Sequence, residues 1–159
     1  MTCMAPLVLF VCTGNICRSP MAAEIFRLAQ PQPPPWRVAS AGLSAYEGAG
    51  ASEFAITAMR DIGGDLTPHR SQPVTPGLVQ QAAAIVVMTA AHQKTLVGRF
   101  PEARDKLFLL RSFDPQAAAC SDLDDPFCGS LHEYRDCRDV IRRAIPGLVR
   151  FLTQSAPSV

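Results

Sequence analysis

The sequence has almost no net charge, no long hydrophobic run and no CxxC pair. Its formal charge is +1 with 18% charged residues, which gives no electrostatic reason to expect a nucleic acid or an acidic membrane surface as partner. The first apolar run, residues 7–11, is too short for a signal-peptide core or a membrane span, and no basic segment precedes it. We therefore expect a cytoplasmic protein with no nucleic-acid and no membrane partner.

Six cysteines are present, but their spacing does not match a disulfide framework or a zinc site. The one short spacing, Cys12 to Cys17, lies within a loop that also contains Gly14 and Asn15. Because there is no secretion signal, free thiols in a reducing compartment are the expected state. We expect no metal site and no cofactor.

Apolar runs and helical patterns alternate along the chain. Residues 7–11 and 83–88 are apolar runs typical of strands that are buried on both faces of a parallel sheet. Ser19 before Pro20 predicts a helix start with Ser19 as the N-cap, and Ser130 with Glu133 predicts a capping box at the last helix. Further strands are expected at 36–40 and 106–110, and further helices at 51–62, 75–81 and 89–97.

This alternation predicts one α/β domain spanning residues 1–159, with a parallel sheet of about four strands and helices on both faces. A chain of this length can bury a sizeable core as one domain. In such sheets ligands bind beyond the carboxyl ends of the strands. The loop that follows residues 7–11 is at such an end.

That loop, residues 12–18, contains a thiol and a guanidinium on a segment that leads from a strand into a helix. Its length allows the backbone N–H groups to curl into a nest for an anion, and the helix that follows adds its positive end. Both features favour the thiolate of Cys12, which makes this residue a candidate nucleophile. Arg18 can hold two oxygens of a phosphoryl group with its planar fork.

A structural role for Cys12, as a small buried apolar residue after a strand, is the alternative. The presence of Gly14, Asn15, Arg18 and Ser19 in the same loop favours the catalytic role. Phosphoryl transfer to a thiolate also requires an acid that protonates the leaving group. Of three aspartates in the loop after the last predicted strand, Asp125 is the best candidate because Pro126 and Phe127 follow it directly.

Two motifs and two shorter segments resemble the low-molecular-weight protein tyrosine phosphatase family. The likeness spans nearly the whole chain, and the two motifs are specific to the chemistry. The segments that carry it are Val11-Cys12-Thr13-Gly14-Asn15-Ile16-Cys17-Arg18-Ser19-Pro20-Met21-Ala22, Asp125-Pro126-Phe127, Ser40-Ala41-Gly42 and Val87-Met88.

The resemblance implies a three-layer sandwich with strand order 2-1-3-4, the phosphotyrosine protein phosphatase I-like fold. It implies Cys12 as the nucleophile that forms a phosphocysteine, Arg18 as the phosphate clamp, and Asp125 as the general acid that later activates water. The family's other loop positions, which bind phosphate or support the loop, correspond here to Thr13, Gly14, Asn15, Ile16, Cys17 and Ser19. Of these, Asn15 and Ser19 are expected to hold the loop and the thiolate by hydrogen bonds.

Cys17 resembles a second loop cysteine of the family, which can form a reversible disulfide with the oxidised nucleophile. An ordinary structural role for Cys17 is equally open. Two other positions depart from the family pattern: Gln72 stands where members often have arginine, and Thr89 where they often have aspartate. These departures concern the contacts that support the loop.

The substrate is open between phosphotyrosine and phosphoarginine. Phe127 after the Asp-Pro pair resembles the bacterial protein arginine phosphatase branch, which usually has threonine at the position of Ile16. Ile16 is the residue of tyrosine-specific relatives, and its apolar side chain suits an aromatic ring. We favour phosphotyrosine, with Tyr46 and Phe127 as aromatic walls of the cleft.

Two other classes fit less well. Arsenate reductases that share this fold need two further cysteines near the middle of the chain, and none occurs between Cys17 and Cys120. A phosphopeptide-binding module without catalysis is disfavoured because Cys12, Arg18 and Asp125 are all present. The expected partner is a phosphorylated protein substrate, and the protein is expected to be a monomer.

Overall fold

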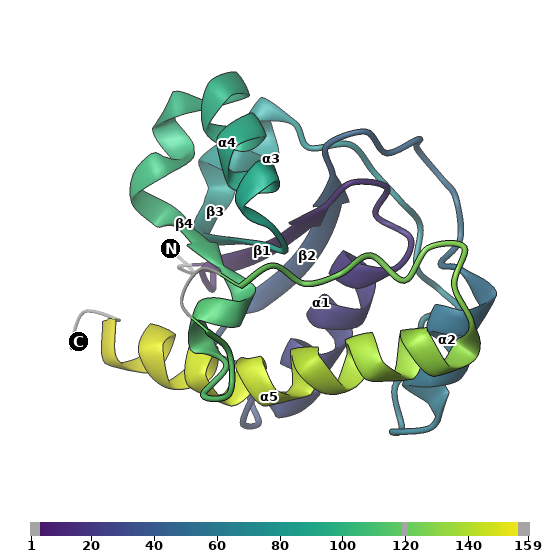
Figure 1. Ribbon diagram of the computed structural model, residues 1–159. Helices are drawn as coiled ribbons and strands as arrows, with labels where there is room; N and C mark the ends of the chain where they lie inside the picture. Colours follow the sequence, from purple (N-terminus) through teal and green to yellow (C-terminus); the bar gives the residue numbers. More distant parts are fainter. Residues whose placement is uncertain (1–3, 119–120, 156–159) are drawn as a thin grey trace.

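A parallel sheet of four strands forms the centre of the computed structural model, which describes residues 4–118 and 121–155 (Figure 1). Cys3 and Cys120 lie outside the described residues. The strand order is β2-β1-β3-β4, and every pairing is parallel. This confirms the predicted α/β class and the order 2-1-3-4. The strands are β1 (Leu7–Cys12), β2 (Arg37–Gly42), β3 (Ala82–Val87) and β4 (Leu107–Leu109).

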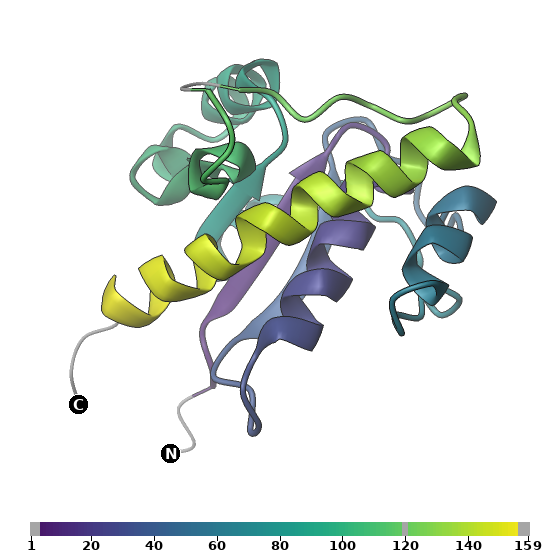
Figure 2. The same ribbon diagram turned by 60° about the horizontal axis from the view of Figure 1, so that its bottom comes forward.

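Helices cover both faces of the sheet, and Figure 2 shows the longest of them lying across one face. On that face the sheet packs with α1 (Arg18–Ala29), α2 (Glu53–Arg60) and α5 (Leu131–Ser155). On the other face lie α3 (Pro76–Gln81), α4 (Ala90–Arg99) and the 3-10 turn η1 (Pro101–Lys106). A second 3-10 turn, η2 (Leu110–Phe113), packs against α5.

Strand β1 is buried on both faces, as its continuous apolar run predicts. Val8 and Phe10 lie in the core under α1 and α5, whereas Leu9 and Val11 lie in the core under α3 and α4, and all four are 0% exposed. Successive side chains of a strand point to opposite faces, so a strand between two helix layers needs apolar residues at every position. The buried strand β1 therefore fixes the position of its last residue, Cys12.

Helix α1 begins at Arg18, two residues earlier than Pro20, the first helical residue if Ser19 were the N-cap. Cys17 is the N-cap, and no side-chain hydrogen bond caps this helix. The prediction that Ser19 is the cap is therefore wrong. The Ser19 hydroxyl lies near the sulfur of Cys12 instead, at 2.9 Å. Pro20 still lies in the first turn, where its missing N–H costs no helical hydrogen bond.

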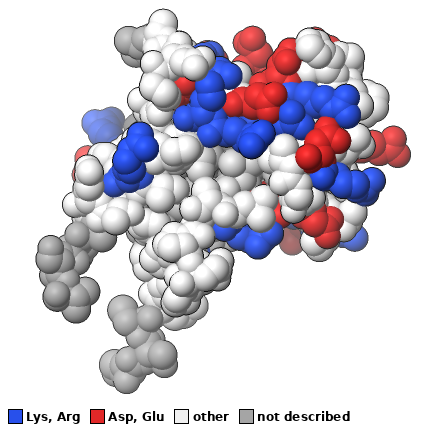
Figure 3. Space-filling model, turned by 90° about the horizontal axis from the view of Figure 1, so that it is seen from below, with Lys and Arg blue, Asp and Glu red and all other residues white. Residues whose placement is uncertain are grey.

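The long helix α5 begins with the predicted capping box. The backbone N–H of Ser130 donates to Glu133 at 2.6 Å, and the backbone N–H of Glu133 donates to Ser130 Oγ at 3.3 Å. Basic and acidic side chains alternate over the face that carries α5 (Figure 3). The buried Arg138 of α5 donates to the carbonyl of Ala58 at 2.9 Å and contacts Asp61 at 3.3 Å, which joins α5 to α2. None of the helices in the described ranges has the length and apolar content needed to cross a membrane.

Two glycines inside helices provide a test of the packing between α5 and η2. A Cβ at Gly147 in α5 would lie 2.6 Å from the carbonyl oxygen of Phe113, whereas a Cβ at Gly98 in α4 would meet nothing within 4 Å. We expect Gly147→Ala to lower the free energy of unfolding by about 1–3 kcal/mol through overpacking. The matched change Gly98→Ala should raise it by up to about 1 kcal/mol, because alanine is the better helix former. Urea denaturation measures both, and a stabilising Gly147→Ala would contradict this packing.

Candidate active site

The loop between β1 and α1 lies at the carboxyl end of the sheet, above the last residue of β2. Gly42, which ends β2, pairs with Cys12 in the register of the two strands. A Cβ at Gly42 would lie 2.5 Å from the carbonyl oxygen of Thr13 and 3.0 Å from the backbone nitrogen of Asn15. Only glycine allows this close approach, which lets β2 support the loop from below.

The sulfur of Cys12 is buried and lies near two hydrogen-bond donors. The backbone N–H of Asn15 points to it at 3.3 Å, and Ser19 Oγ lies 2.9 Å from it. Asn15 Nδ2 donates to the same Ser19 oxygen at 2.8 Å, so the Ser19 hydroxyl hydrogen is left to donate, and sulfur at 2.9 Å is a closer acceptor than the carbonyl of Ala41 at 3.5 Å. Hydrogen bonds of this kind stabilise a thiolate, which is the nucleophilic form of cysteine.

Asn15 fixes the shape of the loop. It is fully buried and adopts a left-handed backbone conformation with φ of 56°. Its side chain donates to Ser19 and, at 2.9 Å, to Ser40 Oγ on β2, and it accepts the backbone N–H of Gln72 at 3.0 Å. The loop is thus joined to α1, to β2 and to the segment that contains Gln72.

Two further residues hold the loop from outside it. The carbonyl oxygen of Asn15 lies 2.7 Å from His69 Nε2, and because a carbonyl only accepts, this nitrogen carries the proton. Burial lowers the pKa of His69, in keeping with a neutral ring. The backbone N–H of Ser52 donates to the carbonyl of Ile16 at 2.9 Å.

The two departures from the family pattern have clear positions in the structure. Gln72 supports Asn15 through its backbone N–H, so that contact does not depend on the side chain at this position. The Gln72 side chain donates to the carbonyl of Ser40 at 3.0 Å, which adds a second link to β2. Thr89 is the N-cap of α4 and accepts the backbone N–H of His92 at 3.1 Å.

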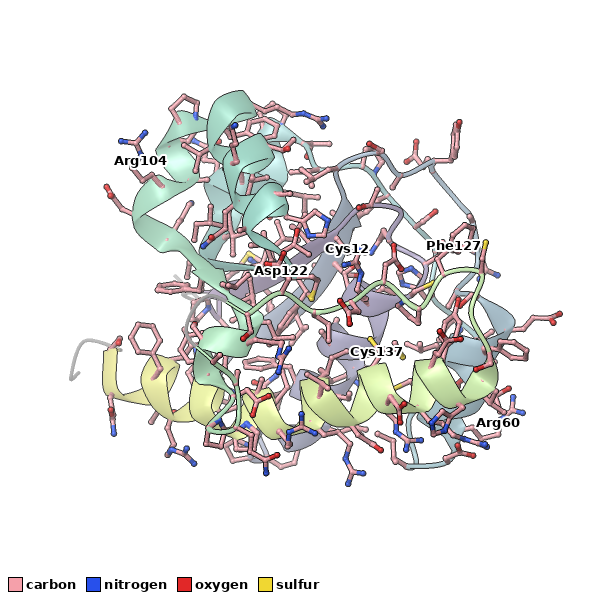
Figure 4. All side chains as sticks on the ribbon, in the orientation of Figure 1. Cys12, Arg60, Arg104, Asp122, Phe127 and Cys137 are labelled. Atoms are coloured by element: carbon pink, nitrogen blue, oxygen red, sulfur yellow. The ribbon has the colours of Figure 1, made fainter. Side chains whose placement is uncertain are left out.

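Arg18 is buried at the base of α1 and contacts the loop that carries Asp125. It donates to the carbonyl of Leu123 at 2.9 Å and to the carboxylate of Asp125 at 3.1 Å. The Leu123 N–H in turn donates to the carbonyl of Met88, just after β3, at 2.9 Å. Figure 4 shows this segment passing over Cys12 on its way from Asp122 to Phe127. The guanidinium, the carboxylate and the thiol therefore meet at one edge of the sheet.

The three aspartates of this segment have different surroundings. Asp122 accepts the backbone N–H of Ala90 at 2.8 Å, so its side chain is used at the start of α4. Asp124 lines only a second cavity, between the segment and α5, which Asp125 also lines. Asp125 lines the cavity above Cys12, and its side chain is 47% exposed. Of the three, Asp125 is therefore the one that a group bound at Cys12 would meet.

A small cavity of about 170 Å³ opens above the thiol. Apart from Asn15 and Ser19, which are buried beneath it, the expected loop residues all line it, together with Asp125 and Phe127. The lining residues are Cys12, Thr13, Gly14, Ile16, Cys17, Arg18, Asp125 and Phe127. Tyr46 is not among them: it is 87% exposed on the loop after β2.

Cys17 is buried below the cavity, near two hydroxyl groups. Its sulfur lies 3.2 Å from Tyr134 Oη on α5 and 3.4 Å from Ser52 Oγ. Burial raises the pKa of Cys17 and raises the pKa of Tyr134 to about 12. Cys17 and Tyr134 are therefore neutral at pH 7. Neither Cys12 nor Cys17 is part of a disulfide.

The sequence analysis does not predict a role at the site for several residues that the structure places there. They are Ser40, Ser52, His69, His92 and Tyr134. Ser40 was open to inference, because it lies near the carboxyl end of the strand beside β1 in a parallel sheet. Across residues 4–118 and 121–155, no three histidine, cysteine, aspartate or glutamate side chains are placed to hold a metal ion.

Comparison with known proteins agrees with this geometry. The family model described as low molecular weight phosphotyrosine protein phosphatase matches residues 7–157. The chain belongs to this family. A protein-arginine-phosphatase of Geobacillus stearothermophilus is 40% identical over 91% of this chain and 95% of its own length. A probable low molecular weight protein-tyrosine-phosphatase, EpsP of Ralstonia solanacearum, is 34% identical over 92% and 95%.

Among solved structures, the YwlE arginine phosphatase from Geobacillus stearothermophilus is similar to this chain. It superposes with a TM-score of 0.85 at 38% identity, and the match covers 94% of each chain. The family and the fold are thus established over the segment that contains the loop and Asp125. The chain is a cysteine-dependent phosphatase by family.

Glycine substitutions at two residues with a positive φ distinguish the role of the Asn15 side chain from the strain in its backbone. Asn15 and the exposed Cys128 have φ of 56° and 65°. Cys128→Gly should raise the free energy of unfolding by about 1 kcal/mol by relieving backbone strain. Asn15→Gly should lower it by about 2–4 kcal/mol, because Ser19, Ser40 and Gln72 lose their buried partner. Urea denaturation checks both values, and equal effects would contradict the bridging role of Asn15.

Proposed function

We propose that this protein hydrolyses phosphotyrosine in proteins through a phosphocysteine formed at Cys12. The observation that carries the proposal is the cavity, in which the thiol, Arg18 and Asp125 meet beneath the apolar side chains of Ile16 and Phe127. A phosphoryl group would lie over the loop, and an aromatic ring would lie between the two apolar residues. The expected occupant is a phosphorylated protein side chain.

In the first step the Cys12 thiolate attacks phosphorus, and the bond from phosphorus to the tyrosine oxygen breaks. The loop N–H groups and Arg18 hold the equatorial oxygens. An incoming phosphate dianion would lie against Arg18, which Asp125 contacts at 3.1 Å in the free protein. Asp125 then gives its proton to the departing phenolate oxygen.

In the second step the Asp125 carboxylate takes a proton from water as the water oxygen attacks phosphorus. The bond from sulfur to phosphorus breaks, which releases inorganic phosphate and restores the thiolate. Ser19 and the backbone of Asn15 stabilise sulfur as the leaving group through the contacts that they make in the free protein. Asp125 therefore acts first as acid and then as base.

Phosphoarginine is the second candidate substrate, and one specific observation favours it. The relative that is 40% identical over most of both chains is named a protein-arginine-phosphatase. The same thiol, clamp and acid would serve a phosphoramidate, since the transferred group is the same. The side chain of Ile16, which is apolar and lines the cavity, favours the phosphotyrosine assignment.

We further propose that Tyr46 takes part in docking the protein substrate, because it is an exposed aromatic residue on the loop after β2. It does not line the cavity, so the part of the substrate that it would contact is the peptide around the phosphorylated residue. The protein is proposed to act as a monomer in the cytoplasm, with residues 1–159 forming a single phosphatase domain.

Asp125→Asn tests the acid. We expect it to lower kcat/KM by about 100-fold or more for phenyl phosphate, whose leaving group needs the proton, and much less for p-nitrophenyl phosphate. Asp124→Asn is the matched control, since this neighbour does not line the cavity above Cys12, and it should leave both rates unchanged. Steady-state kinetics with the two esters measure the effect. Equal losses for both esters would exclude Asp125 as the acid.

Ile16 tests the substrate assignment. The wild type should have a higher kcat/KM for a phosphotyrosine peptide than for a phosphoarginine peptide of the same sequence. Ile16→Thr should lower the phosphotyrosine value by about 10-fold, because the ring loses apolar contact. Ile16→Val has nearly the same shape as threonine without the hydroxyl, and it should keep the wild-type preference. A wild type that prefers phosphoarginine would overturn the assignment. Cys12→Ser, which lacks the nucleophile, measures the hydrolysis of each substrate that does not depend on Cys12.

A further inference from the structure

His92 lies under the wall of the cavity and contacts a residue of the phosphate loop. Its Nε2 is 2.9 Å from Oγ1 of Thr13, the residue directly after Cys12. His92 is only 6% exposed, whereas Thr13 is exposed and lines the cavity. The N-cap Thr89 holds the backbone N–H of His92, so the imidazole projects from the fixed first turn of α4.

The ring of His92 has one nitrogen with a partner and one without. Nδ1 is buried and finds no hydrogen-bond partner among the described residues. Burial, together with the nearby charge of Arg18, lowers the pKa of His92 to about 4, although the carboxylates of Asp125 and Asp122 act in the opposite direction. The ring is therefore neutral at pH 7 and carries one proton.

The position of that proton decides what Thr13 can offer to a substrate. If Nδ1 carried it, a buried N–H would have no acceptor, and such orphaned donors are rare in folded proteins. If Nε2 carries it, this N–H donates to Thr13 Oγ1, and the hydroxyl hydrogen of Thr13 remains free. In the described part of the chain, Thr13 Oγ1 has a side-chain hydrogen bond with His92 alone.

We propose that His92 is a positioning residue that donates from Nε2 to Thr13 and so directs the Thr13 hydroxyl hydrogen to the bridging oxygen of a phosphate ester. The inference rests on the proposed function, because it assigns an acceptor to the substrate. An ester has an oxygen with free lone pairs between phosphorus and the side chain, whereas phosphoarginine has an N–H there. The pair of His92 and Thr13 thus favours esters over phosphoramidates at the atom that leaves.

The first test is the tautomer. Long-range ¹H–¹⁵N correlation spectra of the labelled protein at pH 7 report which ring nitrogen carries the proton. The chain has three histidines, so His92→Gln assigns the His92 signals by difference. We expect the Nε2–H form of His92. A ring protonated at Nδ1, or at both nitrogens, would overturn the inference.

The second test is a double-mutant cycle on turnover of a phosphotyrosine peptide. Thr13→Val and His92→Leu should each lower kcat/KM by about 10-fold, the usual effect of losing one hydrogen bond to a charged or reacting group. The double variant should be no slower than either single variant, because both changes remove the same interaction. Losses that multiply in the double variant would overturn the coupling.

His92→Gln provides the rescue, because its side-chain amide can donate to Thr13 from nearly the same place. It should recover most of the activity that His92→Leu loses, and a variant as slow as His92→Leu would contradict the positioning role. His132→Leu is the matched control: this histidine is exposed on α5, away from the cavity, and its loss should change nothing. Thermal denaturation checks that each variant is folded. If His92→Leu does not fold, Thr13→Val and His92→Gln carry the kinetic test.

The outcomes separate this inference from the proposed function. A wild type that hydrolyses only the phosphoarginine peptide refutes the proposed substrate, and with it the role of Thr13 as donor to an ester oxygen. A wild type that hydrolyses phosphotyrosine but carries the proton of His92 on Nδ1 refutes the inference alone. For Thr13→Val, we expect a smaller loss on phosphoarginine than on phosphotyrosine, and equal losses would overturn the selectivity.

Discussion

The site depends on one buried side chain, Asn15, held in a backbone conformation that most residues avoid. A φ of 56° turns the chain so that the loop curls over Cys12, and the backbone N–H of Asn15 then points at sulfur. The side-chain amide stabilises this turn by joining α1, β2 and the segment around Gln72. The hydrogen bonds of the Asn15 side chain thus stabilise the unfavourable backbone conformation of the same residue.

The parallel sheet brings the partners of Asn15 and the rest of the site to the same edge. The carboxyl ends of parallel strands meet at one edge, so the loop after β1, the end of β2 and the segment after β3 lie together. The backbone N–H of Leu123 donates to the carbonyl of Met88, just after β3. Two residues later, the carboxylate of Asp125 accepts a hydrogen bond from Arg18. The first contact holds the segment at the edge of the sheet, and the second places Asp125 beside the phosphate loop.

The sequence predicts the parts of this structure whose causes are local. Helix α3 ends at Gln81 as predicted and begins at Pro76, one residue after the predicted start, because Thr75 is its N-cap. Strand β1 is buried because every residue in it is apolar. The sequence does not predict the start of α1, because Ser19 has the chemistry of an N-cap but its hydroxyl faces the sulfur of Cys12. His69 and His92 had no local signal, since their partners in the loop lie 54 and 79 residues away. The Tyr134 hydroxyl reaches Cys17 only because α5 packs on α1, a contact between elements that are far apart in the sequence.

The residues that any phosphoryl substrate requires cannot distinguish phosphotyrosine from phosphoarginine. The loop, its clamp, its acid and the strands that aim them transfer a phosphoryl group to sulfur whether oxygen or nitrogen leaves. Discrimination must come from side chains that touch the leaving group, and here Ile16, Thr13 and Phe127 line the cavity beside the reacting atoms. The apolar side chains of Ile16 and Phe127 discriminate between substrates by their shape. The hydroxyl of Thr13 discriminates by whether the substrate atom beside it can accept a hydrogen bond. A donor held by His92 therefore discriminates at the single atom in which a phosphate ester and a phosphoramidate differ.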